Sequence, residues 1–147
     1  MESENRKEHG GWLIQKGSKF CIIAALTESG NSSFFEYFKV LKAGFINGAL
    51  TSAEKTNFSK LDHFFRRFSE TGPWGNETQL KYLEGDIFEF KVKETGLRVT
   101  FFYDPQIRGV IVLTHHFIKK SQRTRKEEIE RANLIKNSFI KGRKIDE

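Results

Sequence analysis

The sequence predicts an α+β domain whose helices pack on one face of a largely antiparallel sheet. Two observations lead to this fold class. Apolar residues recur every three to four positions in residues 58–68 but at every second position in residues 87–103, which is the change from helical to strand periodicity. A chain of 147 residues with 15 phenylalanines is also long enough for one domain with a substantial core.

The first predicted elements are a strand and a helix. Residues 20–26 are apolar and rich in β-branched and aromatic side chains, which is typical of a strand. Ser33 and Glu36 have the spacing of a capping box, so a helix is expected to begin there and to end at Gly44. Residues 45–50 are then expected to form a loop.

A second helix is expected from a second capping-box pattern. Thr51 and Glu54 have the required spacing, and an amphipathic phenylalanine-rich stripe follows in residues 58–68. Gly72 and Pro73 should end this helix, because proline cannot continue its hydrogen-bond ladder.

Three strands in a meander are expected next. Residues 87–93 alternate between apolar and polar, residues 94–96 supply a tight turn with a glycine, and residues 97–103 return as a strand. After a turn at residues 104–109, residues 110–115 form the most apolar stretch and are expected to be the central strand.

The last predicted element is an amphipathic helix. Thr124 and Glu127 form a third capping-box pattern, and apolar residues recur at helical spacing in residues 129–139. We therefore divide the chain into an N-terminal extension, residues 1–18, and one domain, residues 19–147.

Composition narrows the class of protein further. A single cysteine, Cys21, excludes an internal disulfide framework and a multi-cysteine zinc site. No apolar run approaches the ~20 residues of a membrane span, and residues 1–9 lack the apolar segment of a secretory signal. We expect a cytoplasmic protein with no membrane association.

The net charge of +6 is concentrated near the end of the chain. Residues 119–147 contain ten basic and five acidic residues, and residues 119–126 contain five basic residues and no acid. Such a block is a candidate contact for a polyanion. A solvated helix start explains the same charge run equally well.

Three motifs then resemble a known family. The first is a strand with a leucine, a glycine, two acids and a lysine; the second is an arginine that opens the next strand; the third is a basic segment before the last helix. The residues concerned are Leu83, Gly85, Asp86, Glu89, Lys91, Arg98 and Phe117–Thr124. Together they resemble the phage-derived, HigB-like branch of the RelE toxin superfamily. Two departures are Arg125, where the family usually has proline, and His116, where it often has glycine.

The resemblance implies a fold, a function and partners. The implied RelE-like fold has a strand, two helices, a three-strand antiparallel meander and a C-terminal helix on a twisted sheet. The implied function is that of a type II toxin, an endoribonuclease that cleaves mRNA on the ribosome without metal or cofactor and so inhibits translation. The implied partners are the ribosome, mRNA and a cognate antitoxin, expected to be a helix-turn-helix protein.

The residue types suit that chemistry. Metal-independent RNA cleavage uses the ribose 2′-hydroxyl as nucleophile, so it needs a base, an acid and cations for the charged phosphorane. Arginine can hold two phosphate oxygens, and histidine exchanges protons near neutral pH. The candidate catalytic residues are Arg98, Lys91, His115 and Lys119.

Further residues are candidates for RNA contact. Glu89 is expected to orient Arg98 or Lys91 or to act as a base. Because His115 and His116 are adjacent on a strand, at most one should reach a shared site. The candidate RNA-binding residues are Lys93, Lys120, Arg123, Arg125 and His116.

Each of these residues also has a purely structural interpretation, as a surface cation, a solvated lysine or a packed strand-end histidine. Two other functions therefore stay open. One is a RelE-fold protein without nuclease activity, such as a ParE-like inhibitor of a DNA topoisomerase. The other is a module that binds nucleic acid or a partner protein without cleaving anything.

Overall fold

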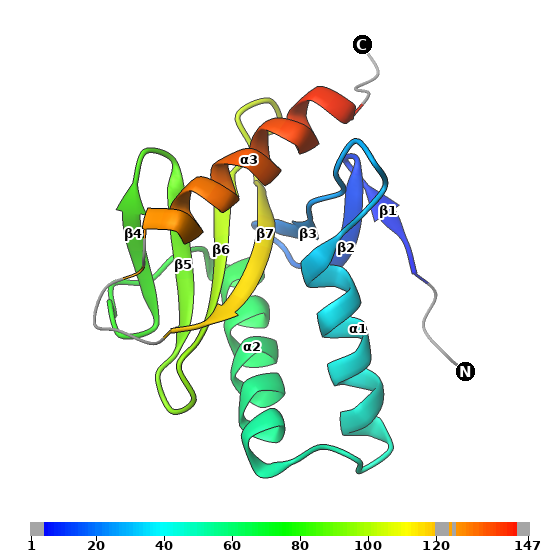
Figure 1. Cartoon of the computed structure of the whole chain (residues 1–147), viewed down its shortest axis with the longest axis vertical. Helices are drawn as coiled ribbons and strands as arrows, with labels where there is room; N and C mark the ends of the chain where they lie inside the picture. Colours follow the sequence, from blue (N-terminus) through cyan, green and yellow to red (C-terminus); the bar gives the residue numbers. More distant parts are fainter. Residues whose placement is uncertain (1–4, 120–123, 125, 144–147) are drawn as a thin grey trace.

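The computed structural model describes residues 5–119, 124 and 126–143, which contain seven strands and three helices (Figure 1). In chain order these elements are β1 (Lys7–Glu8), β2 (Gly11–Lys16), β3 (Cys21–Ala24), α1 (Ser33–Ile46), α2 (Ser52–Thr71), β4 (Leu80–Glu84), β5 (Ile87–Val92), β6 (Leu97–Tyr103), β7 (Val110–Ile118) and α3 (Lys126–Gly142). Among the described residues, no helix is both long enough and apolar enough to cross a membrane.

All seven strands belong to one sheet with the order β1-β2-β3-β7-β6-β5-β4. Only β3 and β7 pair in parallel, and the other neighbours are antiparallel. The α+β class and the mainly antiparallel sheet are therefore confirmed, and β7 is central as its apolar sequence predicts. The arrangement is larger than a strand followed by a three-strand meander, because β1 and β2 extend one end of the sheet and β4 extends the other.

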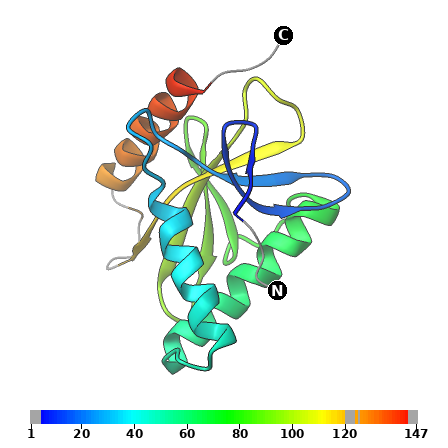
Figure 2. The same cartoon turned by 90° about the vertical axis from the view of Figure 1, so that its right-hand side faces the viewer.

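The strands β1 and β2 lie within residues 1–18, the segment for which the sequence predicts an N-terminal extension. They form a hairpin whose second strand pairs with β3, with Trp12 opposite Ala24. The Trp12 ring stacks on Phe35 of α1 at a centroid distance of 4.7 Å. This packing joins the hairpin (dark blue in Figure 2) to both the sheet and a helix.

The three helices cover both faces of the sheet, whereas the sequence led us to expect one. On the first face α1 and α2 bury a large aromatic core that includes Phe34, Phe65 and Phe68. On the second face α3 buries Ala132 and Phe139 against apolar side chains of β3, β6 and β7 (Figure 1). The prediction of helices on one face is therefore wrong. The central strands carry apolar side chains on both faces, and each apolar face needs helices to bury it.

The predicted helix start at Thr51 is confirmed. The Thr51 hydroxyl accepts from the Glu54 backbone N–H at 3.2 Å, and the Glu54 carboxylate accepts from the Thr51 N–H at 2.8 Å. For α1 the predicted capping box is wrong: Ser32 is the N-cap and its side chain makes no capping hydrogen bond. The helix also continues past Gly44, where a Cβ atom would lie 2.5 Å from a methyl carbon of Leu50.

Two features of the meander position the candidate site. The predicted turn at residues 94–96 is confirmed, with Gly96 at φ +84° in the left-handed region that favours glycine. A bulge interrupts the pairing of β6 with β7, because Val99 lies opposite His116 while Phe101 lies opposite Leu113. The bulged strand therefore has one extra residue, which changes the direction of the side chains that follow it.

Candidate functional site

A buried ion pair, Arg98 and Glu89, lies on the α3 face of β5 and β6. The Arg98 Nε atom is 3.7 Å from the Glu89 Oε1 atom, and the two side chains are only 5% and 3% exposed. The Thr124 hydroxyl, just before α3, donates to Glu89 Oε1 at 2.8 Å. The segment that leads into α3 therefore reaches the pair directly.

The Arg98 guanidinium is not fully satisfied. Its Nε and Nη1 atoms are buried and have no hydrogen-bond partner among the described residues. Burial lowers the pKa of Arg98, against an opposing effect of the Glu89 charge, but arginine stays cationic in proteins. A buried cation with free donors is costly, and an anion that brought acceptor oxygens to it would remove that cost.

Three lysines surround the pair. Lys91 lies opposite Arg98 in the β5–β6 ladder, and Lys81 lies opposite Glu89 in the β4–β5 ladder. Burial lowers the pKa of Lys91, and the Arg98 charge lowers it further. Burial followed by the Arg98 charge also lowers the pKa of Lys119, which follows β7. We call Lys81, Lys91, Arg98 and Lys119 the cationic cluster.

Glu89 is the acid at the centre of this cluster. Burial raises its pKa, and this effect exceeds the opposing contributions of the Thr124 hydrogen bond and of the Arg98 and Lys91 charges. A carboxyl group whose pKa is raised is a better proton acceptor than an ordinary surface glutamate. The geometry fits both roles expected of Glu89, since its carboxylate contacts Arg98 and could also take a proton.

His115 is fully buried at 0% exposure on the same face of the sheet. Its Nε2 atom is 2.9 Å from the Glu128 carboxylate of α3, and its Nδ1 atom is 3.2 Å from the Thr100 hydroxyl and 3.3 Å from the Thr114 hydroxyl. Burial lowers the pKa of His115, although the Glu128 hydrogen bond opposes this effect. Through these hydrogen bonds the ring links α3 to β6.

His116 lies on the opposite face, as expected for adjacent strand residues. Its ring stacks on Tyr37 of α1 with centroids 3.7 Å apart and planes 16° apart. Burial lowers the pKa of His116 to about 4, with smaller contributions from His115 and Arg131. The structure therefore does not bring His116 to the cationic cluster, and the sheet separates the two.

The remaining candidates have simpler placements. Lys93 is exposed at the end of β5, beside the turn. Lys120, Arg123 and Arg125 lie outside the described residues. On the other face of the sheet Tyr103 packs with the α1–α2 core, and with Trp74 and Tyr82 it lines a pocket of about 190 Å³.

Sequence reasoning missed several residues of the site. The sequence gives no sign of Lys81 because it does not predict strand β4. Thr100 and Thr114 are missed because the bulge between β6 and β7 cannot be predicted from the alternation of apolar and polar residues. Glu128 lies in the first turn of α3, where an acidic residue is also explained by the helix dipole. That position gave no signal of a contact with His115.

A comparison with known protein families agrees with the resemblance to a phage-derived, RelE-like family. Residues 49–136 match the family described as phage derived protein Gp49-like (DUF891), and this family is RelE-like and toxin-like. Because the match spans more than half of the chain, the protein belongs to this phage-derived Gp49-like family. The matched segment includes every residue of the cationic cluster, together with Glu89, His115 and Glu128. No curated protein matches the chain.

Proposed function

We propose that the protein is the toxin of a type II toxin–antitoxin pair, of the HigB-like branch, which cleaves mRNA on the ribosome without metal. The observation that carries this proposal is the buried Arg98 guanidinium among three lysines, with Nε and Nη1 atoms that have no hydrogen-bond partner within the described part of the chain. Membership of a toxin-like family supports it. The protein would act in the cytoplasm, where it would meet ribosomes and be neutralised by an antitoxin of the helix-turn-helix type.

The proposed reaction is attack of a ribose 2′-hydroxyl on the adjacent phosphate. Lys91, whose pKa is lowered by burial and by Arg98, or Glu89, whose pKa is raised by burial, would take the 2′-hydroxyl proton. Arg98 would bind the phosphorane oxygens through its guanidinium, and Lys119 would stabilise the added charge.

His115 would have a positioning role in this scheme. Both of its ring nitrogens are engaged, Nε2 with Glu128 and Nδ1 with two threonine hydroxyls, so neither is available to a substrate while these hydrogen bonds are kept. It would hold α3 against β6 and thereby keep Thr124 on Glu89. Protonation of the leaving 5′-oxygen would then fall to one of the lysines of the cluster.

A cell-free translation assay with primer extension on the message tests the proposal. The purified protein should produce discrete cleavage sites on translated mRNA, and K91Q and K119Q should each lower the cleavage rate by about 10²-fold. The matched control is K55Q, since Lys55 is exposed on α2, away from the cluster. An absence of cleavage with translating ribosomes would overturn the proposed activity, whereas unchanged cleavage by K91Q and K119Q would overturn only the proposed site.

A second candidate function follows from the burial of the site. Arg98 and His115 are 4% and 0% exposed, so binding of RNA must first uncover the guanidinium. A RelE-fold protein that inhibits a DNA topoisomerase, or that only binds nucleic acid or a partner, needs no such opening. Inhibition of a topoisomerase would be detected in a DNA supercoiling assay. A protein that only binds nucleic acid would show salt-dependent RNA binding without any cleavage product.

A further inference from the structure

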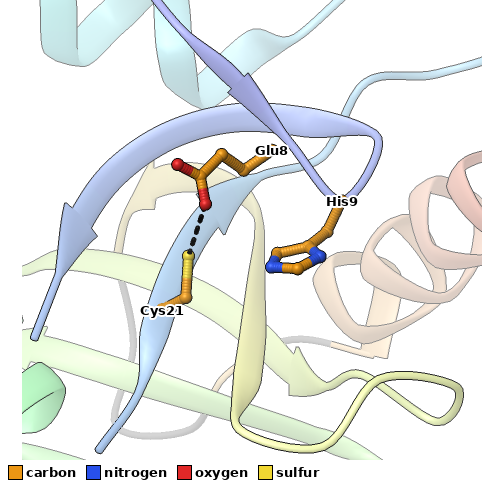
Figure 3. A group of neighbouring side chains, drawn as sticks. All are labelled: Glu8, His9 and Cys21. Carbon is orange, nitrogen blue, oxygen red and sulfur yellow. Dashed lines mark hydrogen bonds between the residues drawn. The ribbon is translucent and has the colours of Figure 1, made fainter. Parts of the chain in front are cut away.

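Three side chains that can bind a metal converge at the end of the sheet where the N-terminal hairpin meets β3 (Figure 3). They are Glu8 at the end of β1, His9 in the turn and Cys21 at the start of β3. One carboxylate oxygen, one imidazole nitrogen and the thiol sulfur all lie within 4.8 Å of one another. The Cys21 thiol donates to Glu8 Oε1 at 4.0 Å.

The backbone holds these residues in place from several sides. Glu8 pairs with Gly11, so His9 and Gly10 form a two-residue turn, with φ of 55° and 87°, as a type I′ hairpin requires. The Arg143 Nη1 atom, at the end of α3, donates to the His9 carbonyl at 3.3 Å. Cys21 in turn pairs with Lys16 of β2 and with Val110 of β7.

The donor set is one that Zn²⁺ prefers. Zinc binds thiolate at ~2.3 Å and imidazole or carboxylate at roughly 2.0–2.2 Å in tetrahedral geometry, so its ligand atoms lie roughly 3.3–3.7 Å apart. The thiol–carboxylate distance of 4.0 Å is close to this range, and a ring nitrogen of the exposed His9 lies within 4.8 Å of both atoms. Three protein ligands leave the fourth position for water, which can enter from the exposed His9 side.

The surroundings also resemble those of a metal site. Arg6 pairs with Glu8 Oε2, which leaves Glu8 Oε1 directed at the thiol and orients the carboxylate as an outer partner does for a metal ligand. Lys16 is the group that zinc would displace, since its Nζ atom lies 3.1 Å from Glu8 Oε1.

We propose that Glu8, His9 and Cys21 form a Zn²⁺ site that fastens the β1–β2 turn to β3. The site lies away from the cationic cluster, because Cys21 pairs with the first residue of β7 while Arg98 pairs with Phe117 near its other end. Its role is to stabilise the N-terminal end of the sheet and is separate from RNA cleavage. The inference does not depend on the proposed function.

The test is a titration of the full-length, metal-free protein with Co²⁺, which absorbs visible light when it replaces zinc in a tetrahedral site. We expect one Co²⁺ per chain, a thiolate-to-cobalt charge-transfer band, and loss of both signals when Zn²⁺ is added. The substitution C21S should abolish the charge-transfer band. H9N and E8Q should each weaken Co²⁺ binding by at least about 10-fold to 100-fold.

The controls separate loss of a ligand from loss of fold. Asparagine is favoured in a type I′ turn, so H9N should keep the hairpin and the circular dichroism spectrum of the parent protein. H63N alters an exposed histidine on α2 and should bind Co²⁺ like the parent. The proposal is overturned if the parent shows no charge-transfer band, or if both H9N and E8Q bind Co²⁺ with unchanged affinity.

Discussion

The Nε atom of Arg98 lies 3.7 Å from the Oε1 atom of Glu89 inside the protein, with the two side chains 5% and 3% exposed. Burial of two charges costs free energy, and the attraction between them repays only part of this cost. Each residue therefore depends on the other, and neither can be removed alone without leaving a buried charge uncompensated. This mutual dependence gives the first prediction.

Removal of either partner should destabilise the fold strongly. We expect R98M and E89L each to lower the free energy of unfolding by about 3–5 kcal/mol, because each leaves one buried charge unpaired. The double variant should lose much less than the sum of the two, as interacting residues do in a double-mutant cycle. Urea denaturation followed by circular dichroism measures all four proteins, and additive losses would show that the pair is not coupled.

The cationic cluster should make RNA binding depend on salt. We expect K91Q and K119Q each to reduce the slope of log K against log salt by about 0.7, the contribution of one phosphate contact on single-stranded nucleic acid. Fluorescence anisotropy with a labelled single-stranded RNA measures the slope. K55Q on α2 is the matched control, and an equal slope in K91Q, K119Q and K55Q would remove the cluster from the binding surface.

Glu128 should control the titration of His115. The Glu128 hydrogen bond raises the pKa of His115 against the larger lowering by burial, so E128Q should lower this pKa further. NMR titration of the imidazole resonances measures the shift directly. An unchanged His115 titration would mean that the two side chains do not interact in solution.

His116 should make the protein less stable in acid. Its pKa is about 4 in the folded protein against an ordinary value of 6.5, so the unfolded chain binds the proton more readily. The free energy of unfolding should therefore fall as the pH is lowered from about 6.5 to about 4, by roughly 3 kcal/mol at most from this residue. H116F keeps an aromatic ring against Tyr37 and should lose this share of the pH dependence.

The comparison for His116 is made by urea denaturation at several pH values between 4 and 7. Burial also lowers the pKa of His115, so H116F should retain part of the slope. H63F is the control, because it makes the same change at an exposed position on α2. An identical slope in H116F and the parent would contradict the prediction.

Local patterns in the sequence predicted much of this fold. The capping box at Thr51, the phenylalanine stripe of α2 and the alternation in β5 and β6 each depend on residues close in the chain, and each is confirmed. Alternation also placed Glu89 and Arg98 on one face of the sheet. The depth of their burial was not predictable, because it depends on α3 and on Thr124, which reach the pair through tertiary packing.

The rest of the candidate site depends on pairings between distant segments. The bulge that joins His115 to Thr100 and Thr114 exists only in the pairing of β6 with β7. Glu8 and His9 approach Cys21 only because β2 pairs with β3. Neither contact leaves a signature in hydrophobic periodicity, which is why the sequence alone predicts an extension for residues 1–18.

The parallel pairing of β3 with β7 has a consequence for the order of folding. The antiparallel ladders β4–β5, β5–β6 and β6–β7 join neighbours in the chain and can close early, whereas Cys21 must find Val110 across most of the protein. Closing such a long loop is slow because its entropy is lost before any contact compensates for it. During synthesis, β3 leaves the ribosome long before its partner β7 exists. The edge of β3 that faces β7 therefore stays unpaired until β7 has also been made.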